Sequence, residues 1–175
     1  FNPTKKNKLA IGIITYNHFE LLEKCVKSLI KQNFKEPFDI IIIDNDINKS
    51  AKDIINISLP KHINISYDVE KNKGIPFARN KVVSLLKNNY DYLAFIDDDE
   101  VADEAWLSSL LSAVIKYNAD VVAGPVTSII DKRLPSWVDD GDFLRTGKNN
   151  NKTGDIISTC GTGNVIIKCK IFKQF

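Results

Sequence analysis

The sequence of 175 residues lacks several features that would assign it quickly to a class of protein. No stretch approaches the roughly 20 consecutive apolar residues that cross a bilayer, and residues 1–8 are polar and basic rather than a secretory signal. The three cysteines, Cys25, Cys160 and Cys169, do not have the spacing of a zinc site, so we expect reduced, buried structural thiols. These absences predict a cytoplasmic protein without a transmembrane segment and leave open a peripheral association with the inner face of the membrane.

Basic residues are not clustered in any one segment of the chain. The formal net charge is +2, and the basic residues are scattered, so there is no electrostatic reason to expect nucleic acid as a partner. Arginine is rare, because only Arg79, Arg133 and Arg145 stand among 24 basic residues. An anionic ligand must therefore be held by a local group of side chains.

Apolar runs alternate with helical patterns over most of the sequence. Helices are expected from Asn17, where Glu20 completes a capping box, around residues 52–57, after Pro76, over residues 107–115 and from Cys169. Strands are expected at 9–15, 38–43, 63–69, 92–96, 120–126 and 164–168. Near-continuous apolar strands separated by helices predict an α/β fold with a mostly parallel central sheet flanked by helices.

The length and composition predict one domain over residues 1–175, since 43% of the residues are hydrophobic and 26% are charged. The chain opens on Phe1 and stops at Phe175 inside a new helical pattern. We therefore expect a fragment that is truncated at the C-terminus.

Three consecutive carboxylates, Asp97, Asp98 and Asp99, directly follow the apolar stretch 92–96. Two carboxylates about 5 Å apart at an effective dielectric constant of about 20 repel each other by roughly 3 kcal/mol. A bound divalent cation is the simplest way to neutralise this repulsion. The alternative is a solvated loop that caps the next helix.

Polar groups also follow the first two strands, as Thr15-Tyr16-Asn17 and as Asp44-Asn45. Ligands of an open parallel sheet bind beyond the carboxyl ends of its strands, so these groups and the three aspartates are expected to share one edge. With a nucleoside diphosphate as ligand, Tyr16 would stack on the base and Asp44 or Asn45 would bond to its edge. Packing of Tyr16 in a loop and turn formation by Asp44 are the structural alternatives.

Arg79 and the aspartates at 97–99 would make the remaining contacts to such a ligand. Arg79 lies at the start of a helix that follows Gly74, where a planar guanidinium and free backbone N–H groups suit a phosphate. The alternative is an exposed arginine on an amphipathic helix. Asp97 or Asp98 would take the ribose hydroxyls. Asp99 would hold a metal ion that bridges the two phosphates.

Five stretches, at 13–17, 41–45, 72–80, 95–100 and 161–164, match one known family and run in its order. The chain resembles a family 2 glycosyltransferase with the nucleotide-sugar-binding, Rossmann-like GT-A fold. The resemblance implies an inverting enzyme that moves a sugar from a nucleoside-diphosphate sugar donor to a hydroxyl of a glycan or lipid-linked acceptor, in the synthesis of bacterial surface polysaccharide or glycolipid. It implies a metal-binding DxD motif at Asp97 and Asp99, with Mn²⁺ or Mg²⁺ as cofactor. The donor-binding residues that we expect are Thr15, Tyr16, Asn17, Asp44, Asn45, Arg79, Asp97 and Asp98.

The chain departs from the family at Asn45, where many relatives carry a second aspartate, which leaves the base preference open. In similar enzymes the catalytic base lies beyond the position of Phe175, so it is not assigned. Acceptor-side candidates are the acids of the long polar loop, Asp139, Asp140 and Asp142, together with Trp137. Two other functions are weighed: a non-catalytic module that binds nucleotide sugars or glycans, and a sugar nucleotidyltransferase, which the lack of a glycine-rich phosphate loop near the N-terminus disfavours.

Overall fold

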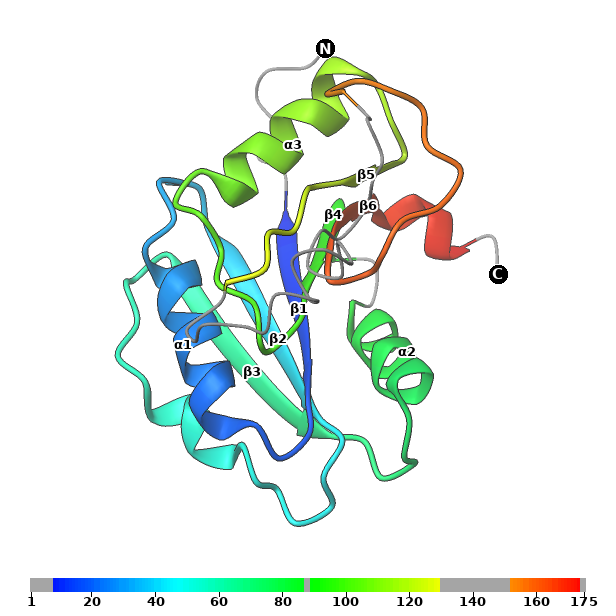
Figure 1. Ribbon diagram of the computed structural model, residues 1–175. Helices are drawn as coiled ribbons and strands as arrows, with labels where there is room; N and C mark the ends of the chain where they lie inside the picture. The colour runs from blue at the N-terminus through cyan, green and yellow to red at the C-terminus, as the bar shows by residue number, and fades with distance from the viewer. Residues whose placement is uncertain (1–7, 87–88, 130–151, 174–175) are drawn as a thin grey trace, which may run out of the picture.

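The structure is a computed structural model that describes residues 8–86, 89–129 and 152–173 (Figure 1). Its strands are β1 (Leu9–Thr15), β2 (Phe38–Asp44), β3 (Ile63–Val69), β4 (Tyr92–Ile96), β5 (Val121–Ala123) and β6 (Asn164–Lys168). Its helices are α1 (Phe19–Ile30), α2 (Ile75–Leu85), α3 (Trp106–Lys116) and the 3₁₀ helices η1 (Lys52–Asn56) and η2 (Cys169–Lys173). The alternation of strands and helices that the sequence predicts is confirmed.

The strands form one sheet in the order β3-β2-β1-β4-β6-β5. The pairs β3–β2, β2–β1 and β1–β4 are parallel, whereas β6 runs antiparallel to both β4 and β5. The prediction of a mostly parallel α/β sheet is therefore confirmed. Because β2 and β4 lie on opposite sides of β1, the strand order reverses at β1, and such a reversal is where open α/β sheets bind ligands.

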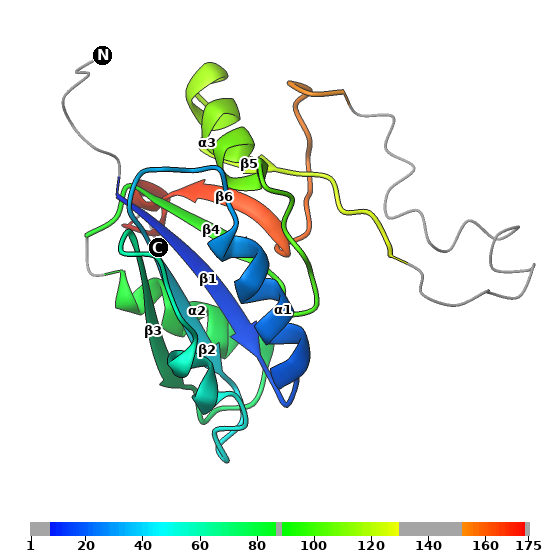
Figure 2. The same cartoon turned by 90° about the vertical axis from the view of Figure 1, so that its left-hand side faces the viewer.

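Helices cover both faces of the sheet (Figure 1, Figure 2). On one face α1, α3 and η1 pack against inward side chains that include Ile11, Ile13, Ile40 and Ile42. On the other face α2 and η2 pack against a second set of apolar side chains from the same strands. Strands that are buried on both faces must be apolar at nearly every position, which explains the continuous hydrophobic runs in the sequence.

Gly12 allows α2 to lie directly on the sheet. A Cβ atom at this position would lie 2.8 Å from both Phe95 Cε1 and Val82 Cγ1. Any larger side chain would therefore push α2 and the ring of Phe95 away from β1. This close contact fixes the distance between the sheet and the helix that carries Arg79.

The start of α1 differs from the expected capping box. The N-cap residue is His18, and its side chain makes no capping hydrogen bond. Asn17 has a positive φ of 56° and donates its backbone N–H to Ser50 Oγ at 3.2 Å. The capping-box prediction is wrong because the end of β1 turns through a left-handed residue before the helix begins.

Two further expectations are corrected near the C-terminal half. The strand expected at 120–126 is shorter and ends at Ala123, because Pro125 has no N–H to continue the ladder and its carbonyl accepts from Asn164 Nδ2 at 2.8 Å. Of the three thiols that were expected to be buried, Cys160 is exposed. In the part of the chain that is described, no helix is long and apolar enough to cross a membrane.

Candidate functional site

The carboxyl ends of β1, β2 and β4 are tied together by hydrogen bonds. Asn45 donates its backbone N–H to the Thr15 carbonyl at 2.8 Å, and Thr15 Oγ1 donates to Asp98 Oδ2 at 2.7 Å. The three polar clusters that the sequence places at strand ends therefore meet at one edge of the sheet.

Asp98 lies at the centre of this junction. Besides the bond from Thr15, its Oδ2 lies 3.5 Å from Nδ1 of His18, a residue that the sequence reading missed. Burial raises the pKa of Asp98, opposed by the Thr15 bond and by His18, while Asp99 and Asp97 raise it further. No pattern in the sequence singles out His18; only the turn after β1 brings it to the acidic residues.

We call residues 97–100, which follow β4, the acidic turn, and Arg79 of α2 contacts it. Its Nη2 donates to Asp97 Oδ1 at 3.3 Å, and its guanidinium carbon lies 6.0 Å from the ring centroid of Phe95. Its Nε is buried and has no hydrogen-bond partner among the described residues. Asp97 and Arg79 keep 47% and 26% of their side-chain surface exposed, so both can still meet a ligand.

Gly163, within the stretch at 161–164, packs against the acidic turn. A Cβ atom on Gly163 would lie 2.6 Å from Asp97 Oδ2 and 2.9 Å from Glu100 Oε1. Only glycine fits there without displacing these carboxylates. Burial, followed by the charge of Asp97, raises the pKa of Glu100.

The acidic turn offers hard oxygen ligands but no complete metal site. No group of three or more His, Cys, Asp or Glu side chains is placed to hold a metal ion in residues 8–86, 89–129 and 152–173. Asp99 is exposed and Asp97 is half exposed. Mg²⁺ typically binds through one or two carboxylates plus substrate phosphates and water, so this pair fits such an ion only together with a phosphate ligand.

Asp44 is enclosed by the turn that follows β2. Its side chain is 0% exposed; Oδ1 accepts from Asp46 N–H at 2.9 Å, and Oδ2 accepts from Ala51 N–H at 2.9 Å and from Tyr67 Oη at 2.8 Å. Burial and the bond to Asp44 raise the pKa of Tyr67. The structure thus gives Asp44 a role in shaping this turn, and its contact with a base stays a prediction.

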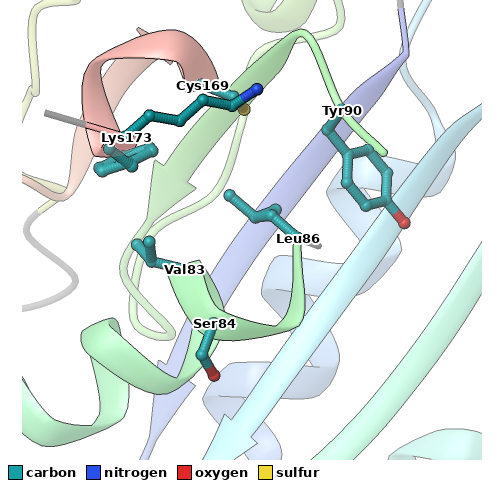
Figure 3. Close-up of a pocket in the computed structure, with 7 residues that line it drawn as sticks. Val83, Ser84, Leu86, Tyr90, Cys169 and Lys173 are labelled. Carbon is teal, nitrogen blue, oxygen red and sulfur yellow. The ribbon is translucent and has the colours of Figure 1, made fainter. Parts of the chain in front are cut away.

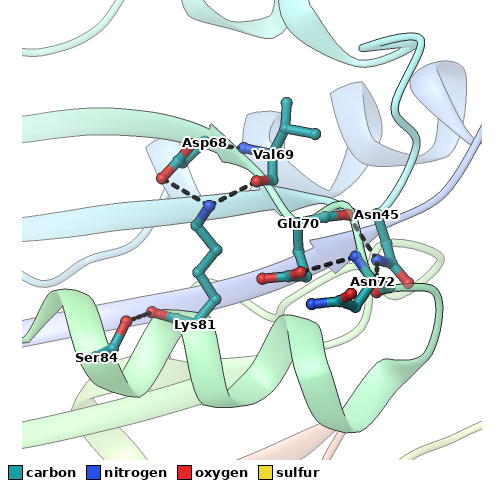
Figure 4. A network of polar contacts seen from close by, with 7 residues as sticks. All are labelled: Asn45, Asp68, Val69, Glu70, Asn72, Lys81 and Ser84. Carbon is teal, nitrogen blue, oxygen red and sulfur yellow. Dashed lines mark hydrogen bonds and ion pairs between the residues drawn. The ribbon is translucent and has the colours of Figure 1, made fainter.

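Asn45 is engaged with the loop between β3 and α2. Its side chain amide bonds to Glu70 and Asn72 (Figure 4) and also to Gly74, and Asn45 is only 7% exposed. Direct contact of Asn45 with a ligand also stays a prediction.

Tyr16 and Asn17 are the open part of the site. Tyr16 is 50% exposed, and Lys73 Nζ lies 6.0 Å from its ring centroid. Asn17 is also exposed. An aromatic face of this kind suits the stacking of a base. The acceptor-side candidates Asp139, Asp140, Asp142 and Trp137 lie outside the described residues.

A separate hollow lies at the opposite edge of the sheet, where α2 ends and β4 begins (Figure 3). It has a volume of about 220 Å³ and is lined by Val83, Ser84, Leu86, Tyr90, Cys169, Phe172 and Lys173. Burial raises the pKa of the Cys169 thiol to about 11. The hollow contains none of the acidic residues of the strand ends, so it is not the candidate site.

The chain is similar in sequence to a known family and to several of its members. The sequence profile described as "Glycosyl transferase family 2" matches residues 10–175. The succinoglycan biosynthesis protein ExoM of Rhizobium meliloti is 33% identical over 147 residues, which cover 82% of this chain and 47% of that protein. The poly(ribitol-phosphate) beta-glucosyltransferase of Bacillus spizizenii is 29% identical over 132 residues, which cover 73% of this chain and 20% of that enzyme.

Solved structures support the same fold. The crystal structure of residues 1–349 of S. aureus TarS superimposes with a TM-score of 0.69 at 18% identity, over 95% of this chain and 48% of that one. A second TarS structure, in complex with UDP-GlcNAc, gives a TM-score of 0.67 at 14% identity, over 95% of this chain and 47% of that one. This chain thus has the GT-A fold and spans less than half the length of these relatives. With the profile matching nearly its whole length, the chain belongs to glycosyl transferase family 2.

Proposed function

We propose that the chain transfers a sugar, with inversion at the anomeric carbon, from a nucleoside-diphosphate sugar to an acceptor hydroxyl in the synthesis of a bacterial surface polysaccharide or glycolipid. Family membership supports this proposal, and so do the names of two relatives, a succinoglycan biosynthesis protein and a poly(ribitol-phosphate) beta-glucosyltransferase. A cytoplasmic location, and any association with the inner face of the membrane, stay predictions.

The observation that carries the proposal is the junction of three strand ends beside Arg79. The bond from Thr15 to Asp98 and the pair of Arg79 with Asp97 bring a cation and partly exposed carboxylates within one cluster. A half-exposed aromatic ring, that of Tyr16, follows Thr15 directly. A nucleoside diphosphate needs these chemistries: a flat face for the base, hydroxyl acceptors for the ribose and positive charge for the phosphates.

In this proposal the side chains of the cluster contact different parts of the donor. Tyr16 stacks on the base, and the free oxygens of Asp97 and Asp98 accept from ribose hydroxyls. Arg79 donates to the diphosphate through the guanidinium hydrogens that Asp97 does not use. Its positive charge stabilises the negative charge that builds up on the leaving diphosphate.

A divalent cation fits beside Asp99 and Asp97 once a diphosphate supplies further oxygen ligands. When bound, Mn²⁺ or Mg²⁺ would neutralise the charge on the leaving group. An inverting reaction also needs a carboxylate that deprotonates the acceptor from the opposite face of the sugar. No described residue is assigned this role.

Thermal unfolding of the 175-residue chain with UDP, GDP or dTDP, each with Mn²⁺ or with a chelator, tests the proposal. A ligand at about 100 times its Kd stabilises the native state by about 2.7 kcal/mol. For a chain of this size that raises Tm by roughly 5–10 °C. We expect such a shift with one diphosphate and Mn²⁺, and the absence of a shift with all three would contradict the proposal. Formation of a sugar nucleotide from NTP and sugar phosphate would instead indicate a nucleotidyltransferase, and nucleotide-sugar binding without any turnover by a longer form of the chain would indicate a binding module.

A further inference from the structure

The side chain of Asn45 donates both of its amide hydrogens to one loop. Nδ2 donates to the carbonyl of Glu70 at 2.9 Å and to that of Asn72 at 2.8 Å (Figure 4), and Oδ1 accepts from Gly74 N–H at 2.8 Å. An amide nitrogen carries two hydrogens, so none is left for a ligand. We call residues 70–74 the β3–α2 loop.

From these contacts we infer that Asn45 is a positioning residue of the proposed donor site: it holds the β3–α2 loop, and with it Lys73 and the first turn of α2, in place for the nucleotide. This inference rests on the proposed function, because it concerns the same site. It differs from the expectation that Asn45 contacts the base directly.

The loop is fixed at its start by a second residue, Lys81 of α2. Its Nζ donates to the Val69 carbonyl at 2.5 Å and pairs with Asp68 Oδ2 at 3.0 Å (Figure 4). In addition, Glu70 N–H donates to the Asp44 carbonyl at 2.9 Å. These bonds hold the backbone where the loop begins. The side chain amide of Asn45 then positions the loop as far as Gly74.

The held loop controls two parts of the proposed site. Lys73 lies over the Tyr16 ring at 6.0 Å, so the loop borders the surface proposed for the base. Gly74 has a φ of 132° and precedes α2, and its carbonyl accepts from Phe77 N–H at 3.1 Å and Ala78 N–H at 3.3 Å. Because Arg79 follows in the same helix, a shift of Gly74 would also move the guanidinium.

The geometry explains why an amide serves here and an aspartate does not. A carboxylate at position 45 could still accept from Gly74 N–H, but its other oxygen would face the carbonyl oxygens of Glu70 and Asn72 without a hydrogen between them. Two buried acceptors facing each other lose both hydrogen bonds and repel. Asn45→Asp should therefore release the loop even though it is nearly the same size.

The test compares Asn45→Asp with Asn48→Asp in the full 175-residue chain. Asn48 is exposed in the turn that follows the same strand, so its variant introduces the same charge without touching the loop. Asn45→Ser, which is uncharged and can donate one hydrogen bond, is measured as well and replaces Asn45→Asp if that variant does not fold. Two quantities are measured: the amide NMR shifts and hydrogen exchange of residues 70–79, and the Kd for UDP, or for whichever diphosphate the wild type binds, with Mn²⁺.

We expect Asn45→Asp to shift amide signals and to speed exchange within residues 70–79, with binding about tenfold weaker, whereas Asn48→Asp stays within twofold of the wild type. Asn45→Ser should fall between them. Unchanged amide signals and exchange across residues 70–79 would overturn the inference, and so would faster exchange with unchanged affinity. A wild type that binds no nucleoside diphosphate would refute the proposed function and this inference together, which is a different outcome from normal binding by Asn45→Asp.

Discussion

Thr15 donates a hydrogen bond of 2.7 Å to Asp98, 83 positions further along the chain. The bond joins the end of β1 to the acidic turn after β4, across the point where the strand order reverses. It holds a partly buried carboxylate whose pKa is raised by burial. Through this bond the stability of the sheet edge and the shape of the proposed site depend on each other.

Thr15→Val should therefore lower the stability of the fold and weaken ligand binding at the proposed site. Valine has nearly the same shape but leaves Asp98 without the hydroxyl donor, which should lower the free energy of unfolding by about 1–2 kcal/mol. Binding of a nucleoside diphosphate should weaken as well. Urea denaturation and calorimetry measure the two effects. Thr15→Ser, which retains the hydroxyl, is the matched control, and equal stability of the valine variant and the wild type would show that the bond has no energetic role.

Asp99→Asn should remove the metal-dependent part of nucleotide binding. The amide is a weaker ligand than the carboxylate and carries no charge, so Mn²⁺ should no longer add to the rise in Tm produced by the diphosphate. Asp53→Asn, at an exposed acid of η1, is the control for the loss of one negative charge. A full Mn²⁺ effect in the Asp99 variant would remove Asp99 from the proposed site.

Gly12→Ala tests the packing of α2 on the sheet. The added Cβ would lie 2.8 Å from Phe95 and Val82, and overpacking of this kind typically costs about 1–3 kcal/mol. Gly161→Ala is a suitable comparison, because a Cβ there meets nothing within 4 Å. Thermal unfolding should show a lower Tm for the first variant and a change close to zero for the second. Similar values for both would mean that the α2 contact can relax.

Ionisation of Tyr67 should destabilise the fold at alkaline pH. Burial and the bond to Asp44 raise its pKa in the folded state above the ordinary value of about 10. A raised folded-state pKa contributes stability that is complete below about pH 10 and is lost as the pH rises toward the folded-state value. Tyr67→Phe should cost about 1–2 kcal/mol at neutral pH and make the alkaline decline less steep. Urea denaturation at pH 7 and above pH 10 checks both effects, and an unchanged alkaline slope would contradict the assignment.

The sequence predicts the strands of this fold well because β1, β2 and β4 are buried on both faces, whereas β3 alternates between more and less buried residues. The runs at β1 and β3 have the expected bounds, and β2 extends one residue further, to Asp44. What the pattern could not predict depends on contacts between distant residues. β5 ends before Pro125, whose carbonyl accepts from the side chain of Asn164, and a left-handed Asn17 replaces the expected helix cap.

The sequence predicts which residues lie at the site, but it does not predict the hydrogen bonds that they make. Parallel order alone requires the residues after β1, β2 and β4 to meet at one edge. The sequence does not reveal that Asp44 is closed in by Ala51 and Tyr67, or that both amide hydrogens of Asn45 bond to the β3–α2 loop. Those partners come from other segments, so only the folded structure separates residues that face a ligand from residues that support the site.

A crystal structure of the chain with UDP and Mn²⁺ is the most direct test of the central claim, that the three strand ends together bind a nucleoside diphosphate. We predict the base on Tyr16, the diphosphate beside Arg79 and an anomalous Mn²⁺ signal next to Asp99 and Asp97. A nucleotide bound elsewhere, or an edge that stays empty at saturating UDP and Mn²⁺, would contradict the claim.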